Sequence, residues 1–163
     1  MRAAANPPLP MASRQLMLPD EAATATLARR ISGLARAGDV IALTGDLGAG
    51  KTFFARAFIG EADVPSPTFT LVQIYERPPG SPGPRIWHFD LYRLKQASEA
   101  IELDIEDAFV EGISLIEWPE RLGPLLPVER LDVALEFLPD PQARRARLTG
   151  TGRWAGLLAE IVP

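Results

Sequence analysis

A chain of 163 residues, 47% hydrophobic and 23% charged, is long enough for one domain that buries a core without metal or disulfide support. It has no cysteine, which excludes disulfides, zinc sites with thiolate ligands and cysteine nucleophiles. A net charge of −4 is not that of a free-standing nucleic-acid binder, and no apolar run approaches the length of a membrane span.

The first part of the chain predicts a tail, a strand and a helix. Residues 1–12 are rich in alanine and proline and lack the apolar segment of a secretory signal, so we expect a disordered tail on a cytoplasmic protein. Residues 13–18 fit an edge strand. Apolar residues recur at helical spacing after Asp20, and Gly38 is suited to end that helix. Residues 13–163 then form a single domain.

The next strand, loop and helix contain the most informative motif. Residues 40–43 read as a buried parallel strand, and apolar residues at helical spacing after the loop predict a helix that ends near Gly60. The loop between them fits the phosphate-binding pattern G-x-x-x-x-G-K-[ST], with Gly45, Asp46, Leu47, Gly48, Ala49, Gly50, Lys51 and Thr52.

Each residue type in this loop has a physical role at a phosphate. Glycines let the backbone curl so that its N–H groups face phosphate oxygens, and the following helix presents its positive end to the same anion. Lys51 adds a charge for the β- and γ-phosphates, and the Thr52 hydroxyl can ligate Mg²⁺. Lysine occurs only at positions 51 and 95, so an incidental surface lysine is a poor alternative.

The remaining chain alternates strands and short helices. Strands are expected at 69–75, 86–90, 113–117, 131–138 and 144–149, and helical turns at 97–110, 118–122 and 153–161. Residues 77–85 are too rich in proline and glycine for regular structure, and they connect two strands that we expect to pair antiparallel. The pattern predicts a three-layer α/β sandwich of the P-loop NTPase type, with a mixed, mostly parallel central sheet.

Two acidic residues follow apolar strands. Glu117 comes after residues 114–116 in a Walker-B-like pattern, and Asp90 comes after residues 86–89. Ligands of open α/β sheets bind at the carboxyl ends of strands, where carboxylates hold Mg²⁺ or orient water. We expect both acids to serve the site, and a helix cap or a surface ion pair is the alternative. Which of the two contacts the metal directly stays open.

Four other positions are weaker candidates. His88, the only histidine, is either a proton acceptor or phosphate-sensing group, or a hydrogen-bonded structural residue. Arg93 could pair with phosphate or with a nearby carboxylate. Ser66 and Thr68 lie where a switch segment would sense the γ-phosphate, although on their own they fit a proline-stiffened loop better.

Several segments together resemble the TsaE (YjeE) family. They are GDLGAGKT at 45–52, SPTFTLVQIYE at 66–76, HFDLYRL at 88–94, LDIEDAF at 103–109 and LIEWPER at 115–121. They occur in the order of the family and cover most of the stretch from 40 to 121. The phosphate loop alone is shared with many families, whereas the other segments are far more specific.

The resemblance implies an ATPase that binds and hydrolyses Mg-ATP, slowly and with help from partners. It would support TsaB- and TsaD-like proteins in the threonylcarbamoyladenosine modification of tRNA, at the adenosine next to the anticodon. The transfer reaction itself would belong to TsaD, and tRNA would be contacted only through the complex. No membrane is involved.

The resemblance also assigns roles by matching positions. Thr52 and Glu117 would lie on the Mg²⁺ side, and Asp90 would support hydrolysis or metal binding beside the catalytic Lys51. Thr68 would belong to the switch-like segment. Trp118 would lie near the nucleotide or the partner face. The chain departs from the family at Phe53, where a second hydroxyl residue often reaches the α-phosphate.

Three other functions share parts of this pattern. A small-molecule kinase would need an arginine-bearing lid, for which residues 77–85 are available. A GTPase is disfavoured because neither lysine has an Asn-Lys-x-Asp setting. A nucleotide-dependent docking switch without appreciable hydrolysis is the third. Four arginines could form a docking or tRNA face for such a switch, although charges guarding a strand edge explain them better: Arg144, Arg145, Arg147 and Arg153.

Overall fold

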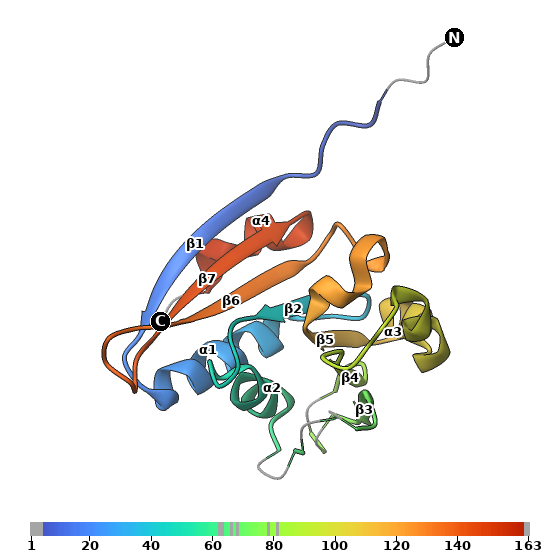
Figure 1. Ribbon diagram of the computed structural model, residues 1–163. Coiled ribbons are helices and arrows are strands. Elements are labelled where there is room, and N and C mark those ends of the chain that lie inside the picture. Colours follow the sequence, from blue (N-terminus) through green and yellow to red (C-terminus); the bar gives the residue numbers. More distant parts are fainter. Residues whose placement is uncertain are drawn as a thin grey trace.

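The computed structural model describes residues 5–61, 64, 65, 67, 69–77, 79, 80 and 82–161, and its centre is one seven-stranded sheet (Figure 1). The strands are β1 (Met11–Leu18), β2 (Val40–Thr44), β3 (Val72–Tyr75), β4 (Ile86–Asp90), β5 (Ile113–Glu117), β6 (Leu131–Phe137) and β7 (Arg144–Thr151). The α-helices are α1 (Glu21–Leu34), α2 (Lys51–Ile59), α3 (Ile105–Glu111) and α4 (Arg153–Leu157). Three 3₁₀ segments complete the described part of the chain: η1 (Ala97–Leu103), η2 (Pro119–Leu125) and η3 (Leu158–Glu160).

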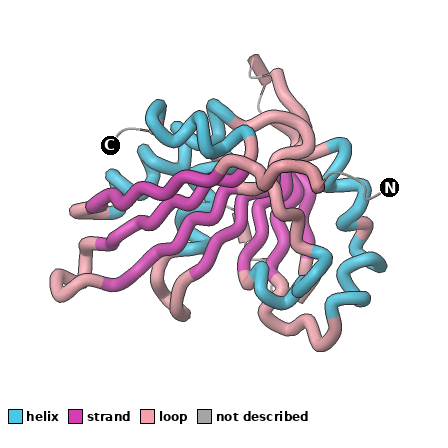
Figure 2. The backbone as a smooth tube through the Cα atoms, turned by 90° about the horizontal axis from the view of Figure 1, so that it is seen from above, coloured by secondary structure: helices cyan, strands magenta, loops and turns pink. Residues whose placement is uncertain are grey.

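The sheet is mixed and mostly parallel, as predicted. Its strand order is β1-β7-β6-β2-β5-β4-β3, and Figure 2 shows the strands side by side. The central strands β6, β2, β5 and β4 are parallel neighbours. β7 and β3 run in the opposite direction, while β1, which is antiparallel to β7, runs with the centre. The carboxyl ends of β2, β4 and β5 therefore meet at one edge of the sheet.

Helices cover both faces of the sheet and make two cores. Because successive side chains of a strand point to opposite faces, β2 contributes Ile41 and Leu43 to one core and Val40 to the other. The first core lies between the sheet and the helices α1 and α2, which are below the sheet in Figure 1, and α4 adds Trp154 to it. The second core is formed with η1, α3 and η2, which include Ala100, Ile105 and Leu122. This arrangement confirms the three layers.

Two strands begin away from their expected positions. β1 starts at Met11, two residues before the expected strand and inside the expected tail. β3 starts at Val72 rather than at residue 69, because Leu71 adopts φ 65° and its N–H donates to the carbonyl of Pro67 at 2.6 Å. A residue in that conformation cannot extend a regular strand ladder.

Helix α1 is shorter than expected, ending at Leu34 and not near Gly38. The Leu34 carbonyl accepts a hydrogen bond from Arg153 at 2.6 Å, and the Asp39 carboxylate accepts one from the N–H of Arg36 at 2.8 Å. Both contacts replace bonds that would continue the helix. The other elements lie within three residues of their predicted ranges, including the break at Asp104, which adopts φ 58°.

No helix in the described part of the chain has the length and apolar character needed to cross a membrane.

Candidate functional site

The loop between β2 and α2 is curled by glycines. Gly45, Gly48 and Gly50 have φ values of 147°, 80° and 108°, a region that side-chain-bearing residues rarely adopt. A Cβ atom on Gly45 would lie 2.6 Å from the carbonyl oxygen of Leu135 on β6. Glycine is therefore required at this position by both conformation and space.

Helix α2 starts directly at this loop, with Gly50 as its N-cap. No side chain caps the helix, so the N–H groups of its first turn are available to an anion in front of them. Phe54 and Phe58 are 0% and 2% exposed and stack with their ring centroids 6.4 Å apart. These rings fix the helix to the core and hold its positive end at the carboxyl edge of the sheet.

Lys51 points back across the loop. Its ammonium group donates to the carbonyl oxygens of Gly45 and, at 3.4 Å, Asp46. It also lies 4.0 Å from the ring centroid of Trp118, which stacks at a tilt on Tyr92 with the ring centroids 5.0 Å apart. The charge is thus held by a carbonyl pair and an aromatic face.

Burial and nearby acids act on Lys51 in opposite directions. Removal from water lowers the pKa of the Lys51 ammonium below its ordinary value, and this effect is the largest. Four carboxylates oppose it: Glu117, Glu120, Asp90 and Asp46. A ligand that brings further negative charge to this place would stabilise the charged lysine.

The carboxylate of Glu117 connects Thr52 with His88. The hydroxyl of Thr52 donates to Oε1 of Glu117 at 3.1 Å, and Nε2 of His88 lies 2.7 Å from Oε2 of the same carboxylate. Glu117 is 2% exposed and His88 is fully buried. His88 therefore contacts the site through Glu117, and its ring does not line the cavity in front of the loop.

Asp90 and Glu117 are paired in register at the ends of the parallel strands β4 and β5. Asp90 is 6% exposed and accepts a hydrogen bond from the N–H of Tyr92 at 3.2 Å. Both acids line a cavity of about 320 Å³, here called the phosphate-side cavity, together with the loop and the start of α2. Its other lining residues are Leu47, Gly48, Gly50, Lys51, Thr52, Phe53 and Trp118.

The donor set fits magnesium bound together with a phosphorylated ligand. One hydroxyl and two carboxylates are oxygen donors, which Mg²⁺ prefers, and Mg²⁺ sites commonly combine one or two carboxylates with substrate phosphates. Within the described ranges no group of three or more His, Cys, Asp or Glu residues is placed to hold a metal by itself. Thr52, Glu117 and Asp90 therefore suit a metal that is shared with the ligand.

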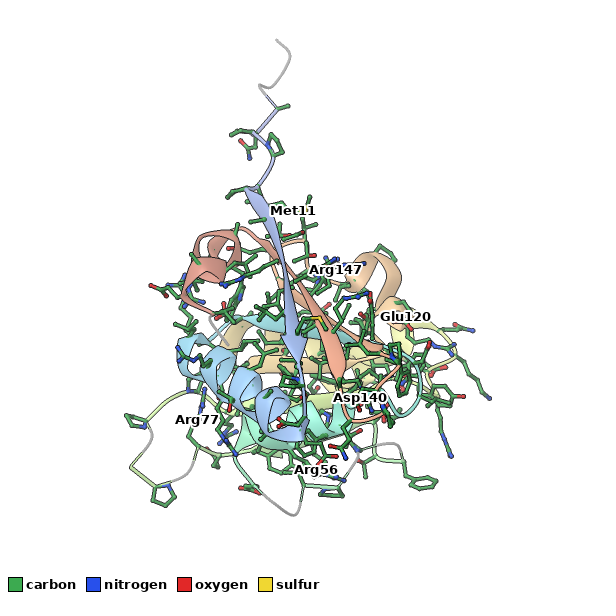
Figure 3. All side chains as sticks on the ribbon, turned by 90° about the vertical axis from the view of Figure 1, so that its left-hand side faces the viewer. Met11, Arg56, Arg77, Glu120, Asp140 and Arg147 are labelled. Atoms are coloured by element: carbon green, nitrogen blue, oxygen red, sulfur yellow. The ribbon has the colours of Figure 1, made fainter. Side chains whose placement is uncertain are left out.

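A larger cavity of about 660 Å³, here called the outer cavity, adjoins the same loop. It shares Gly48, Gly50 and Phe53 with the phosphate-side cavity. Its remaining walls come from the loop itself, from the start of α1, from the start of β7 and from the turn before it, which Asp140 marks in Figure 3. They are Asp20, Glu21, Ala22, Thr24, Ala49, Pro141, Gln142 and Arg144.

The outer cavity was not predicted by the sequence analysis. Asp20 and Glu21 stand at the start of α1, where acidic residues are common, and Asp20 accepts a hydrogen bond from the N–H of Ala23 at 2.8 Å. Arg144 is brought to the loop by the pairing of β7 with β6, and its Nε donates to the carbonyl of Ala49 at 3.0 Å. No local pattern in the sequence signals this contact.

The weaker candidates have different outcomes. Arg93 lies over the ring of Phe69, with its guanidinium carbon 4.6 Å from the ring centroid, and it does not line the phosphate-side cavity. Thr68, like Ser66, lies outside the described residues, so its expected switch role stays a prediction.

The arginines of β7 do not guard a strand edge, which corrects that expectation. β7 lies between β1 and β6, inside the sheet. Arg145 and Arg147 each pair with Glu136 of β6 at 3.4 Å, on the face where Arg147 is labelled in Figure 3. Arg153 pairs with Asp39 at 2.6 Å. These contacts are cross-strand and helix-end ion pairs.

A family model described as "Threonylcarbamoyl adenosine biosynthesis protein TsaE" matches residues 18–146, a range that includes the loop, both strand-end acids and Arg144. The chain belongs to the TsaE family. Members of this family take part in tRNA threonylcarbamoyladenosine biosynthesis, in agreement with the resemblance drawn from the motifs.

Individual TsaE relatives extend over most of the chain. The TsaE protein of Rickettsia bellii is 39% identical over 135 residues, which cover 80% of this chain and 91% of the relative. The TsaE protein of Bacillus subtilis is 34% identical over 141 residues, covering 84% and 85%. The crystal structure of Bacillus subtilis YdiB superimposes with a TM-score of 0.71 at 27% identity, covering 92% of this chain and 93% of YdiB.

Proposed function

We propose that this TsaE-family chain binds and hydrolyses Mg-ATP to support a TsaB- and TsaD-like pair in threonylcarbamoyladenosine modification of tRNA. One observation carries the proposal. The uncapped helix start, Lys51, Thr52 and the acids Asp90 and Glu117 all line a single cavity at the carboxyl edge of the sheet. Cationic, N–H and carboxylate groups around one cavity are what a nucleotide with its metal requires.

The two cavities divide the nucleotide between them. The triphosphate occupies the phosphate-side cavity, where the loop N–H groups and Lys51 face it. The nucleoside extends past Gly50 and Phe53 into the outer cavity, whose volume of about 660 Å³ lies within the range of small-molecule sites. Glu21 and Arg144 provide acceptor and donor groups there.

The residues then have distinct tasks. Lys51 leaves the carbonyl oxygens of its own loop and donates to phosphate oxygens, which neutralises negative charge during hydrolysis. Thr52 and Glu117 would hold magnesium, which when bound polarises the phosphate oxygens. Asp90, next to Glu117 in register, orients the attacking water and accepts its proton.

A kinase is less well supported by the observed contacts. The two arginines of the candidate lid are both engaged elsewhere. Arg77 donates to the hydroxyl of Ser32 on α1 at 3.1 Å, and Figure 3 shows it below that helix. Arg85 pairs with Glu76 at 2.7 Å. Neither lines the phosphate-side cavity.

The proposal is tested by Mg-ATP turnover of the chain alone and with a purified TsaB–TsaD-like pair. Asp90→Asn and Glu117→Gln should each lower turnover by about 100-fold or more, since groups that act directly on the transferred proton or the metal contribute at that level. The melting temperature of each variant is the control for folding. Unchanged turnover in both variants, or stoichiometric phosphorylation of a small acceptor without partners, would contradict the ATPase assignment.

The partner part of the proposal needs its own measurement. The chain, ATP and Mg²⁺ should together increase the yield of threonylcarbamoyladenosine made by the purified pair on tRNA, and Glu117→Gln should remove the increase. An equal yield with and without the chain would contradict its proposed role with the TsaB- and TsaD-like pair.

A further inference from the structure

The only histidine of the chain lies in the middle of β4, between β3 and β5, and is fully buried. Its Nε2 is 2.7 Å from Oε2 of Glu117. An ionised carboxylate has no hydrogen to donate, so Nε2 carries the hydrogen and is the donor. Nδ1 is then an acceptor, and no donor reaches it among the described residues, so the imidazole is held by its Nε2 contact alone.

The other oxygen of the same carboxylate is also engaged. The Thr52 hydroxyl donates to Oε1 of Glu117 at 3.1 Å. The terminal torsion of a glutamate has broad minima, so a carboxylate with one partner can rotate. Donors on opposite sides, from β4 and from α2, fix the plane of Glu117.

Among the described residues, the contact with Glu117 is the one side-chain hydrogen bond that His88 makes. Its neighbours on the same face of β4 are Ile86 and Asp90. Its register partners are Leu115 on β5 and Gln73 on β3, and the Gln73 amide donates instead to the Thr70 hydroxyl at 3.3 Å. An apolar side chain would fill this place without the cost of desolvating an imidazole. The Nε2 contact to Glu117 is the interaction that offsets this cost.

We propose that His88 is a positioning residue for the magnesium site. It holds Oε2 of Glu117 so that Oε1 stays directed at Thr52 and at the phosphate-side cavity. His88 has no exposed surface and does not line that cavity, so it acts only through Glu117. The inference rests on the proposed function, because it assumes that Glu117 serves a metal bound with a nucleotide. Outer partners of metal ligands commonly change metal affinity by about 10- to 100-fold.

Two amide variants separate positioning from folding. His88→Gln places an amide N–H₂ near the position of Nε2, whereas His88→Asn carries the same group too far back to reach Glu117. Each protein is loaded with the non-hydrolysable ATP analogue that has an imido bridge between the β- and γ-phosphates. Mn²⁺ then replaces Mg²⁺, and its binding is followed by electron paramagnetic resonance. Affinity for the analogue is also measured in EDTA, and melting temperatures are recorded.

The account predicts that His88→Asn weakens Mn²⁺ binding by about 10-fold or more, with analogue affinity in EDTA unchanged within about twofold. His88→Gln should recover most of the Mn²⁺ affinity. His88→Leu, which fills the space without a donor, should behave like His88→Asn.

Three results would overturn the inference. Wild-type Mn²⁺ affinity in His88→Asn and His88→Leu would show that Glu117 needs no positioning. Equal losses in His88→Gln and His88→Asn that follow their melting temperatures would make His88 a folding residue only. If the unmodified protein does not bind the analogue at all, the result contradicts the proposed function, and the inference about His88, which rests on that function, is withdrawn as well.

Discussion

At the scale of single residues, the contacts of Lys51 support the proposed phosphate site. Its ammonium group is held by two carbonyls of its own loop and by the ring of Trp118, and a triphosphate offers stronger acceptors than any of these. Binding of ATP should therefore move the ammonium group away from the indole.

This movement predicts a fluorescence change. Trp118 is half-buried at the cavity, whereas Trp87 and Trp154 are buried in the cores and do not line it. Addition of ATP should change the tryptophan emission of the unmodified protein, because the charge beside one indole is displaced. Trp118→Phe should abolish the change while calorimetry still detects ATP binding. An equal change in Trp118→Phe would show that the signal comes from elsewhere.

The lowered pKa of Lys51 predicts a pH dependence. Burial disfavours the ammonium form in the free protein, and bound phosphates favour it, so binding raises the pKa again. The affinity for ATP should therefore have its full value at pH values below the pKa of Lys51 in the free protein. It should fall as the pH rises above that pKa towards 10.5, the ordinary lysine value. The decrease is limited to about tenfold per pH unit.

ATP titrations between pH 7 and pH 10 measure this slope. Lys51→Arg is the matched control, because a guanidinium keeps its charge over this range. Equal slopes for the two proteins would assign the pH dependence to another group.

The residues that line the candidate site were partly predictable from the sequence. The phosphate loop has fixed spacing, and Asp90 and Glu117 each end an apolar run, so local patterns were sufficient for them. The contact of His88 with Glu117 depends on two strands being parallel neighbours, which spacing along the chain does not encode. The wall formed by Glu21 and Arg144 joins residues far apart in sequence for the same reason.

At the scale of elements, the loop between β2 and α2 depends on its close packing against β6. Gly45→Ala should lower the free energy of unfolding by more than Gly60→Ala, although both glycines have positive φ values of 147° and 87°. An alanine at 60 meets nothing within 4 Å and should cost about 1–2 kcal/mol for its conformation alone. At 45 the new Cβ would also lie 2.6 Å from the Leu135 carbonyl oxygen.

Urea unfolding of both variants measures the difference. Equal losses of stability in Gly45→Ala and Gly60→Ala would mean that β6 shifts to accept the new Cβ atom at no cost in free energy. The loop would then not depend on its packing against β6.

The sequence predicted which helices and strands exist better than it predicted where each of them begins and ends. Apolar periodicity predicted the strands of the centre and the helix after the phosphate loop. α1 ends early because Arg153, more than a hundred residues later, binds its last carbonyl. β3 starts late because Leu71 turns the chain. Tertiary contacts of this kind outweigh local propensity, and no window of sequence contains them.

At the scale of the whole molecule, β1 completes the first core from the edge of the sheet. Leu16 and Leu18 are 5% and 2% exposed, and all eight residues of the strand pair with β7. The edge position of β1 was predicted. The interior position of β7 was not, because strand order is set by packing between distant segments.

Truncation tests the role of β1. Removal of residues 1–9 should leave the melting temperature and ATP binding unchanged, since residues 5–9 are exposed and lie outside regular structure. Removal of residues 1–18 uncovers β7 and part of the core, and the protein should not fold cooperatively. Circular dichroism melts of both truncations decide this. A cooperative melt of the longer truncation at the original temperature would show that β1 is dispensable.

The central claim is that the loop ending at Thr52 binds the phosphates of ATP, and calorimetric titration of ATP into two lysine variants tests it most directly. Lys51→Ala removes the buried ammonium group at the cavity, and Lys95→Ala removes the exposed one outside it. We expect Lys51→Ala to lose at least about 100-fold in affinity, as for a buried charged partner, and Lys95→Ala to bind like the unmodified protein. If Lys51→Ala binds ATP within about twofold of the unmodified protein, the assignment of this loop is wrong.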